Sequence, residues 1–361
     1  MSQTNQPVRI LVVGCGNMGA SHALAYHQLD GFEIVGLVSR GDSKKRLNEK
    51  LGGGYPLYDD YEEALRASKP DAVSINTYPE THEPYAVMAF EAGCHVFVEK
   101  PLASTVEGAE NVVKAAQKAN KKLVVGYILR HHPSWQKFVE MSKDLGKPLV
   151  MRMNLNQQSQ TDMWRLHRNL MASLSPIVDC GVHYIDVMSQ MTQSKPARVS
   201  AIGVRLTDDI PEDNYNYGQL QITFEDGSVG WYEAGWGPMI SENAFFIKDI
   251  FGPKGSLSIM AKTAGGEGKS SSIEAHTQTE SLLLHHAELN ENEEFAKEDE
   301  WIDLSDEPDH NELCKREQEY FLDAIINDKD LTQHAEDAVD SLRIAFACDE
   351  SVRTGKTIVL N

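Results

Sequence analysis

The 361-residue sequence predicts an α/β protein of two domains, in which a doubly wound parallel sheet precedes a domain built on extended strands. Strand-type apolar runs alternate with amphipathic helical segments through the first third of the chain. From about residue 148 the pattern becomes the two-residue alternation typical of sheet strands. The length also exceeds what one hydrophobic core usually supports. We therefore place the domains at residues 1–128 and 129–361, with the C-terminal helix packing back on the domain junction.

A glycine-rich turn follows the first strand-type run, Val8–Val13. Its sequence, GCGNMG, has the G-x-G-x-x-G spacing and leads into a helical pattern. The first glycine of such a turn permits a tight bend, the second lets the backbone approach a pyrophosphate, and the third lets helix and strand pack closely. The amides at the helix N-terminus then face the phosphates. The turn predicts a dinucleotide site made by Gly14, Gly16, Asn17, Met18 and Gly19.

The end of the second strand bears on the choice of cofactor. The segment Phe32–Arg40 ends on Ser39 and Arg40, at about the distance past the glycines where an NAD site offers a carboxylate to the ribose. An NADP site avoids that carboxylate and places a cation nearby, and arginine binds phosphate through a planar fork. We therefore predict NADP(H) in preference to NAD(H), although Asp42 lies close enough in sequence to reach a ribose.

Strand and helix segments continue to alternate up to residue 128, and polar residues follow the strands. Parallel strands place their carboxyl ends on one edge of the sheet, where ligands of doubly wound folds bind. Asn76 and Thr77 follow one strand, and Glu99, Lys100 and Pro101 follow another. Because proline stops a central strand, Lys100 is expected on a rigid turn at the ligand edge.

Composition argues against several kinds of partner. The chain has 34 Lys and Arg against 54 Asp and Glu, a net charge of −20, which disfavours nucleic acid and anionic membranes. Five scattered cysteines without a CxxC pair indicate reduced thiols, and no apolar run suggests an export signal or a membrane span. We expect a cytoplasmic protein. Neither His131–His132 nor His285–His286 has metal-ligand spacing, so no metal is expected.

Four ordered motifs carry a resemblance to a known family. They are VGCGNMG, INTYPETH, HVFVEKPLA and DCGVHYIDV, which begin at Val13, Ile75, His95 and Asp179. Together they resemble the Gfo/Idh/MocA family of glucose–fructose oxidoreductase, inositol dehydrogenase and rhizopine-catabolism proteins, and the likeness runs nearly end to end. It implies a Rossmann nucleotide domain followed by an α/β domain with a large, mostly antiparallel sheet, acting on sugars or cyclitols.

The resemblance also assigns roles to residues. It implies that Lys100 of the E-K-P motif sits beside nicotinamide and substrate, and that Asp179 and His183 form the D-x-x-x-H motif. A loop after the strand that ends near residue 75 runs past the nicotinamide ribose. The cofactor residues implied in this way are Asn76, Thr77, His82, Glu99 and Lys100.

The pair Asp179 and His183 can also be interpreted from its chemistry, without the resemblance. On a helix Asp179 and His183 share one face, and a carboxylate beside an imidazole fixes its tautomer. By itself the pattern more often marks a buried histidine satisfied by an aspartate, but the E-K-P motif and the dinucleotide site favour catalysis. Oxidation of a secondary alcohol needs a proton acceptor, for which His183 is suited by an ordinary pKa near ~6.5. Lys100 would stabilise the developing alkoxide, and its acting as the proton carrier stays open.

Substrate residues are less firmly indicated. Arg130, Trp164 and Arg165 resemble family positions near the sugar pocket, and a surface salt bridge is an equally good explanation of each. The segment NLMASLSPIVD, residues 169–179, stands where the family usually has a glycine-rich turn. Substrate identity is therefore the least transferable inference.

The sequence thus predicts an NAD(P)-dependent oxidoreductase acting on a secondary alcohol or ketone of a sugar, cyclitol or related polyol. A dihydrodiol-type dehydrogenase, an enzyme that retains its cofactor while oxidising and re-reducing one substrate, and a non-catalytic dinucleotide sensor are the alternatives. Asp226-Gly227 between two strand-type runs predicts a hairpin in the second domain. The other face of that domain's sheet needs cover, which suggests a homodimer or homotetramer.

Overall fold

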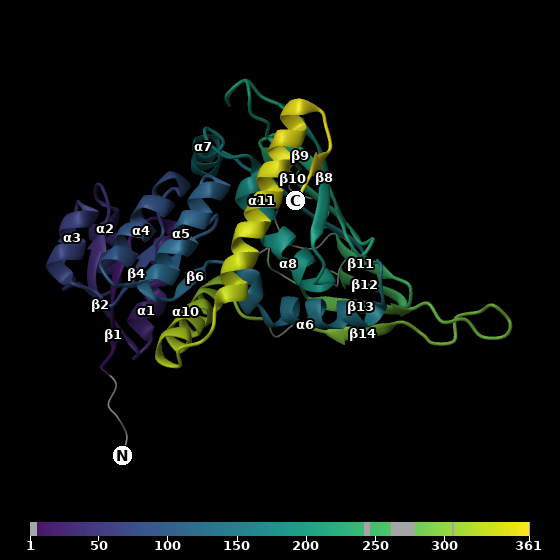
Figure 1. Ribbon diagram of the computed structural model, residues 1–361, viewed down its shortest axis with the longest axis horizontal. Coiled ribbons are helices and arrows are strands. Elements are labelled where there is room, and N and C mark those ends of the chain that lie inside the picture. The colour runs from purple at the N-terminus through teal and green to yellow at the C-terminus, as the bar shows by residue number, and fades with distance from the viewer. Residues whose placement is uncertain (1–5, 242–245, 261–276, 278, 305–306, 361) are drawn as a thin grey trace, which may run out of the picture. The chain divides into compact units, whose positions relative to one another are not determined.

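The computed structural model describes residues 6–241, 246–260, 277, 279–304 and 307–360 (Figure 1). The chain divides into two compact units. Unit 1 comprises residues 1–128 and 308–339, and unit 2 comprises residues 129–307 and 340–361. The sequence-based boundary at 128/129 is thus also where the chain first passes from one unit to the other. Of the helices that the structure describes, none is long and apolar enough to cross a membrane.

Unit 1 is built on a parallel sheet of six strands in the order β3-β2-β1-β4-β5-β6. The chain starts in the middle of the sheet, runs to one edge, and then returns to fill the other side. This order reverses between β1 and β4, which is the point where doubly wound folds bind ligands. The strands are β1 (Val8–Val13), β2 (Phe32–Val38), β3 (Leu57–Tyr58), β4 (Ala72–Ile75), β5 (His95–Val98) and β6 (Leu123–Val125).

Three helices of unit 1, α3, α5 and α10, begin at side-chain caps. Asp60 accepts a hydrogen bond from Glu63 N, Thr105 from Gly108 N, and Asp309 from Glu312 N, so each satisfies an amide of a first helical turn. The helices are α1 (Asn17–Gln28), α2 (Ser43–Lys50), α3 (Tyr61–Ser68), the 3₁₀ turn η1 (Pro79–Thr81), α4 (His82–Glu91), α5 (Val106–Ala119) and α10 (His310–Ile326).

Helix α10 belongs to unit 1, which corrects the assignment of residues 308–339 to the second domain. It packs on α1, and its Phe321 is fully buried in a cluster with Phe32 and Phe97. Burial of apolar surface in this core, which the linear order of the sequence does not reveal, decides the membership. Ile326, the last residue of the helix, is 47% exposed.

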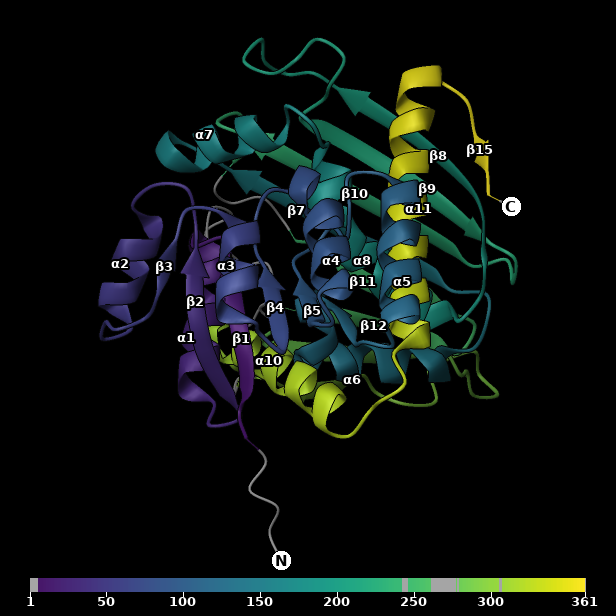
Figure 2. The same ribbon diagram turned by 60° about the vertical axis from the view of Figure 1, so that its left-hand side comes forward.

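The described part of unit 2 forms a nine-stranded sheet in the order β14-β13-β12-β11-β7-β10-β9-β8-β15 (Figure 2). Neighbouring strands are antiparallel except β7 and β10, so the predicted mostly antiparallel sheet is confirmed. The strands are β7 (Val150–Gln158), β8 (Pro196–Val204), β9 (Tyr217–Phe224), β10 (Val229–Gly237), β11 (Lys248–Gly252), β12 (Gly255–Met260), β13 (Ser281–His286), β14 (Glu300–Asp303) and β15 (Ile358–Val359).

The hairpin predicted at Asp226-Gly227 joins β9 to β10. Gly227 has a φ of 84°, a conformation that favours glycine, and Asp226 Oδ1 accepts a hydrogen bond from Ser228 N. Both features are local, which is why the dipeptide identified the turn from sequence.

One face of the unit 2 sheet is covered by helices. Trp135 of α6 is buried against Tyr184 of α8, which stacks on Tyr232 of β10 at 4.9 Å between ring centroids. The helical elements are η2 (Ile128–His131), α6 (Pro133–Ser142), η3 (Lys143–Leu145), α7 (Thr161–Leu170), η4 (Ile177–Gly181), α8 (Val182–Thr192) and α11 (Thr332–Thr354), with the unit boundaries falling within η2 and α11. Apolar side chains on the other face of the sheet remain exposed, among them Ile202 and Val204.

Candidate functional site

The three glycines of the turn have different surroundings. Gly14 has a φ of 90°, and a Cβ atom there would lie 2.3 Å from the carbonyl oxygen of Asn76. A Cβ atom on Gly19 would lie 1.8 Å from the carbonyl oxygen of Gly14. Gly16, by contrast, would meet no atom of the chain within 4 Å. The first and third glycines are therefore required by internal packing, whereas the second leaves open space beside the backbone.

Helix α1 begins at this open space with its amides available. Its N-cap is Gly16, no side chain caps the first turn, and the turn contains no acidic residue. The uncapped amides and the helix dipole favour an anion here. The turn and the helix start, including Asn17 and Met18, therefore fit the pyrophosphate of a dinucleotide.

The end of β2 gathers cations around Ser39. The Ser39 hydroxyl lies 2.7 Å from that of Ser43, and Arg40 is exposed. Lys44, only 5% exposed, donates from Nζ to the carbonyl oxygens of Ser39 at 2.7 Å and Gly41 at 2.8 Å and to Asp59 Oδ1 at 2.6 Å. Its three ammonium protons are therefore engaged, and Lys44 holds this loop in place. Sequence reasoning missed this structural role, because it depends on a partner 15 residues away.

Asp42, the residue that could have served an NAD ribose, is exposed and paired with a neighbour. Lys45 Nζ donates to its Oδ1 at 2.8 Å, and this hydrogen bond, with the ammonium charge, lowers the pKa of the Asp42 carboxyl. The pair is a surface ion pair of a kind that contributes little to stability.

The loops after β4 and β5 are joined by His82. Its Nδ1 lies 2.7 Å from the carbonyl oxygen of Pro101, and its Nε2 lies 3.0 Å from that of Thr77. Burial lowers the pKa of His82, and the two carbonyls oppose this shift. The side chain is fully buried, so the position of His82 accounts for the fixed separation of the two loops, and contact with a cofactor stays a prediction.

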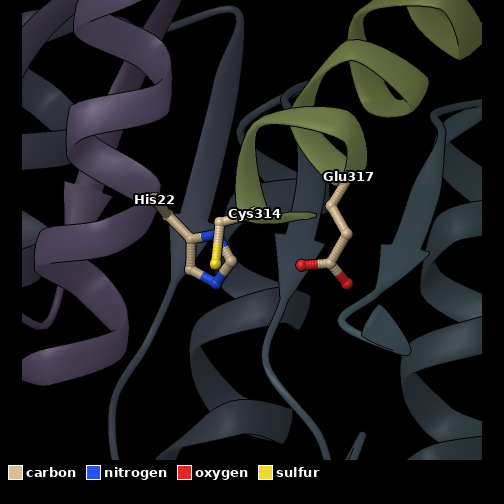
Figure 3. Close-up of side chains that lie close together, drawn as sticks. All are labelled: His22, Cys314 and Glu317. Atoms are coloured by element: carbon tan, nitrogen blue, oxygen red, sulfur yellow. The ribbon is translucent and has the colours of Figure 1, made fainter. Parts of the chain in front are cut away.

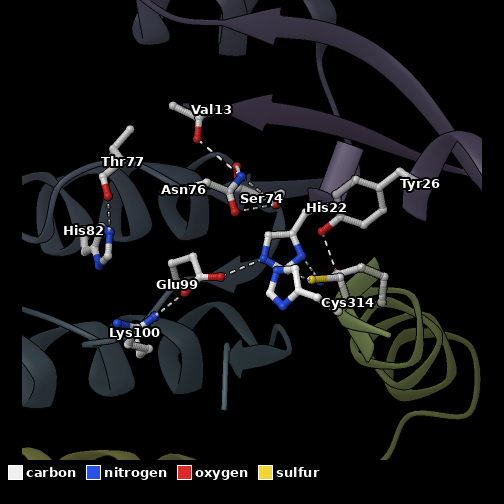
Figure 4. A network of polar contacts seen from close by, with 12 residues as sticks. Val13, His22, Tyr26, Ser74, Asn76, Thr77, His82, Glu99, Lys100 and Cys314 are labelled. Atoms are coloured by element: carbon white, nitrogen blue, oxygen red, sulfur yellow. Dashed lines mark hydrogen bonds and ion pairs between the residues drawn. The ribbon is translucent and has the colours of Figure 1, made fainter. Parts of the chain in front are cut away.

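The turn predicted at Lys100 is present, with Lys100 half-buried and its peptide bond to Pro101 cis. Behind it, Glu99 is buried, and its two carboxylate oxygens have different partners (Figure 4). Oε1 lies 2.7 Å from His22 Nε2, and Oε2 accepts from the Lys100 backbone N–H at 3.1 Å. The Glu99 carboxylate thus links the backbone of Lys100 to His22, a buried residue of unit 1.

A cluster with metal-ligand chemistry lies beside Glu99. Ligand atoms of His22, Cys314 and Glu317 lie within 4.8 Å of one another, and all three residues are buried (Figure 3). Both ring nitrogens of His22 are already engaged, with Glu99 and with Gln318 at 2.9 Å. Burial raises the pKa of the Cys314 thiol and of the Glu317 carboxyl, which favours their neutral forms. A hydrogen-bonded network explains this cluster better than an ion.

Unit 2 holds the D-x-x-x-H motif at a change of helix type. Asp179 lies in the π-helical turn η4, and His183 lies in the α-helix α8 that follows it directly. Cys180 Sγ donates to Asp179 Oδ2 at 3.4 Å. Asp179 is buried and His183 is half-buried. Single π turns inside helices occur frequently at functional sites.

Three residues far apart in sequence brace the start of the π turn. The carbonyl of Ser175 accepts from Asp179 N at 3.0 Å, and its hydroxyl accepts from Val178 N at 3.1 Å. That hydroxyl donates to Asp349 Oδ1 at 2.7 Å, and Tyr215 donates to the same oxygen at 2.6 Å. Burial raises the pKa of Asp349. No sequence motif indicated this bracing, because its members come from three separate segments.

Polar and aromatic groups from two strands and a helix lie next to the turn. Gln157 Oε1 accepts from Trp236 Nε1 at 2.8 Å and lies 3.9 Å from Cys180 Sγ. The ring of His167, on α7, stacks on Trp236 with 4.3 Å between centroids. All three side chains are buried, so they pack beside the turn, and nothing in the local sequence singled them out.

The predicted substrate residues are engaged in ion pairs or hydrogen bonds. Arg130 binds Asp186 through two nitrogens, with Nε to Oδ2 at 2.8 Å, and Asp186 is buried. Arg165 is exposed and pairs with Asp162 at 2.8 Å. Trp164 Nε1 donates to Asp209 at 3.4 Å. The salt-bridge explanation is therefore favoured for both arginines, and the Arg130 pair is a buried one rather than a surface one.

The same holds for the histidine pair of the second sheet. His285 Nδ1 lies 2.7 Å from Asp299 Oδ1, and His286 Nε2 lies 2.7 Å from Glu300 Oε1. The two rings contact different carboxylates of the neighbouring segment. This arrangement gives the adjacent histidines separate structural partners.

The sheet order and the glycine turn define unit 1 as a nucleotide-binding domain of the Rossmann class. Comparison with family models identifies the family. Residues 8–127 match the oxidoreductase family with an NAD-binding Rossmann fold, and residues 137–258 match the GFO/IDH/MocA C-terminal domain. The chain belongs to the Gfo/Idh/MocA oxidoreductase family.

Individual relatives agree with this membership. The D-glucoside 3-dehydrogenase of Escherichia coli is 30% identical over 190 residues, which are 51% of this chain and 54% of the relative. The inositol 2-dehydrogenase of Azotobacter vinelandii is 31% identical over 193 residues, or 50% and 53%. The chain therefore spans about half the length of the curated relatives it matches. The solved scyllo-inositol dehydrogenase of Lactobacillus casei with bound NAD(H) and scyllo-inositol shares the fold, with a TM-score of 0.75, 19% identity, and coverage of 98% of this chain and 99% of that one.

Proposed function

We propose that this protein is an NAD(P)-dependent oxidoreductase that transfers a hydride between nicotinamide and a secondary alcohol or ketone of a sugar, cyclitol or related polyol. The observation that carries the proposal is the open space beside Gly16 at the uncapped start of α1, in a chain that also holds Lys100 on a strand-end turn. Relatives named for glucosides and inositols support the substrate class.

Three residues have chemical roles in this proposal. His183 takes the proton from the substrate hydroxyl, since imidazole ordinarily titrates near ~6.5. Lys100 donates a hydrogen bond to the reacting oxygen and stabilises its developing negative charge. Asp179 orients the substrate and His183 from the braced π turn. A bound nicotinamide dinucleotide would accept or supply the hydride.

Turnover by the whole protein tests these roles. Lys100→Met and His183→Ala should each lower kcat on a polyol substrate by about 100-fold or more, the range for removal of an acid/base or a charge-stabilising group. Lys114→Met, an exposed lysine on α5 paired with Glu110, is the matched control. Cofactor binding without turnover on any polyol would instead favour a non-catalytic sensor, and turnover on aromatic dihydrodiols a dihydrodiol-type dehydrogenase.

A preference for NADP(H) over NAD(H) is part of the proposal. Arg40 is exposed at the end of β2, beside the hydroxyls of Ser39 and Ser43. An arginine fork beside two serine hydroxyls suits a 2′-phosphate. Calorimetric titration with the two cofactors measures the preference, and tighter binding of NAD(H) would contradict it.

We also propose a homodimer or homotetramer that forms through the open sheet face, defined by the outward side chains of β7 to β11. A shallow cavity of about 520 Å³ on this face is lined by residues that include Arg152, Thr223, Val229 and Trp231. Ile202 on β8 is 59% exposed. Exposed apolar side chains gathered on one face are typical of an interface. Ile202→Glu should shift the mass measured by light scattering toward the monomer, whereas Ile326→Glu in unit 1 should not.

Cytoplasmic residence completes the proposal. Cys15, Cys94, Cys180, Cys314 and Cys348 are all free and buried, as is usual in a reducing compartment. Fractionation of cells that make the full protein would test this, and recovery outside the cytoplasm would contradict it.

A further inference from the structure

A chain of buried polar side chains runs from α10 to the turn that carries Lys100. Tyr26 Oη donates to Gln318 Oε1 at 2.6 Å, Gln318 Nε2 lies 2.9 Å from His22 Nδ1, and His22 Nε2 lies 2.7 Å from Glu99 Oε1. Tyr26, Gln318 and His22 are all at most 1% exposed. Water therefore has no access to compete for these hydrogen bonds, which strengthens each one.

The donor and the acceptor in each of these hydrogen bonds can be worked out from the tyrosine end. A tyrosine hydroxyl is the donor to Gln318 Oε1, so the amide nitrogen of Gln318 is the atom that faces His22. An amide nitrogen only donates, so His22 Nδ1 must accept. The proton of a neutral His22 ring is therefore on Nε2, where it donates to the Glu99 carboxylate. The sequence of donors and acceptors is consistent from beginning to end.

The chain ends on the backbone of Lys100. Glu99 Oε2 accepts from the Lys100 N–H at 3.1 Å while Oε1 is held by His22. The carboxylate also lies against Gly126, where a Cβ atom would approach it to 3.3 Å. The contact with His22 and the close packing against Gly126 fix the orientation of the carboxylate. In this orientation Oε2 accepts the hydrogen bond from the Lys100 amide.

We propose that His22, Gln318 and Tyr26 are positioning residues for Lys100, acting through Glu99. The proposal rests on the proposed function, because it gives Lys100 a role in turnover. Helix α10, which follows Lys100 by more than 200 residues, thereby contributes to the geometry of the turn. None of the three positioning residues touches the substrate or the reacting atoms in this proposal.

His22 is the position at which the proposal is most directly tested. His22→Leu keeps an apolar group of similar size but leaves Glu99 Oε1 without its donor. His22→Gln can both accept from Gln318 and donate to Glu99, so it should restore the chain. We expect kcat to fall about tenfold or more in His22→Leu, as for loss of a hydrogen bond to a charged group, with cofactor Kd unchanged and most of kcat recovered in His22→Gln. Equal kcat values in the two variants would overturn the proposal.

Tyr26→Phe provides a second test in which folding is retained. The ring stays packed against Phe32, and only the hydroxyl that orients the Gln318 amide is removed. We expect a severalfold fall in kcat at unchanged cofactor Kd. Tyr61→Phe is the control, since Tyr61 is also a buried tyrosine of unit 1 but donates to the carbonyl oxygen of Tyr85 instead. Equal activity of Tyr26→Phe and Tyr61→Phe would contradict the positioning role.

Two further measurements separate this proposal from the proposed function. Turnover of a polyol by the wild-type protein tests the function alone, and the ratio of variant to wild type tests the positioning chain. If the wild type turns over a polyol and His22→Leu does so at the same rate, only the positioning role of His22 is overturned. If the wild type turns over no polyol, the function fails and the positioning role with it. Nitrogen NMR of His22 measures its tautomer independently of activity. A proton on Nε2 supports the proposed row of hydrogen bonds, and a proton on Nδ1 overturns it.

Discussion

Replacement of Glu317 by glutamine should change how the stability of unit 1 depends on pH. Glu317 is 1% exposed, and among the described atoms its Oε1 has no hydrogen-bond partner. Burial raises the pKa of this carboxyl well above 4.5, and the nearby charge of Glu99 raises it further. The neutral acid is thus the form that the folded protein favours, and glutamine resembles it in shape and charge.

The sign of the effect follows from proton binding. Because the folded-state pKa is raised, the folded protein holds a proton that the unfolded chain releases above about pH 4.5. Stability from this group is complete below that value and falls as the pH rises toward the folded-state pKa. One proton corresponds to about 1.4 kcal/mol of unfolding free energy per pH unit. Above about pH 4.5 the wild type should therefore lose stability with rising pH faster than Glu317→Gln, by up to about 1.4 kcal/mol per pH unit.

Urea unfolding followed by circular dichroism at several pH values measures the difference. Tryptophan fluorescence is unsuitable, because all five tryptophans lie between residues 135 and 301, in unit 2. Glu319→Gln, an exposed position on the same helix, is the control and should keep the wild-type pH dependence. The same pH slope in Glu317→Gln and wild type would refute the reasoning.

Three further predictions concern binding and the π turn. Gly16→Ala should keep wild-type stability but weaken dinucleotide binding at least tenfold by calorimetry, whereas Gly19→Ala should also destabilise unit 1 by about 1–3 kcal/mol, because its Cβ meets a backbone oxygen. Arg40→Met should weaken binding of NADP(H) more than of NAD(H) by about tenfold or more, as for loss of a hydrogen bond to a charged group, and equal losses would contradict a role toward the 2′-phosphate. Ser175→Ala should cost about 1–3 kcal/mol of unfolding free energy and lower kcat at unchanged cofactor Kd, and an unchanged kcat would leave the bracing purely structural.

The parts of the fold that were predictable depend on neighbours in sequence. Strand and helix alternation, the glycine turn and the Asp226-Gly227 hairpin each reflect conformational preferences within a few residues. The structure confirms the hairpin, and it places Gly14 and Gly16 between β1 and α1 and Gly19 in the first turn of α1. The same local logic identified the turn at Lys100, because a proline after a strand restricts the backbone directly.

The parts that were missed depend on groups far apart in sequence. The sequence around Lys44 is that of an ordinary polar helix, but in the structure its ammonium group binds two carbonyls of its own loop and Asp59, 15 residues away. For Arg130 the sequence left a substrate contact and a salt bridge equally open, and the buried Asp186 that it binds is 56 residues away. Periodicity cannot predict such pairs, since it reports which face of an element is apolar and not which side chain lies opposite.

The sequence by itself thus determined the two-domain α/β class, the dinucleotide turn, the position of Lys100 at a strand end and the family of the chain. Only the tertiary structure decided that α10 belongs to unit 1 and that Asp179 lies in a braced π turn. It also decided that Glu99 contacts His22, which in turn contacts Gln318 and, beyond it, Tyr26. The physical reason is the range of the interactions. Turns and periodic patterns are set by adjacent residues, whereas a buried polar group finds its partner only when distant segments are brought together.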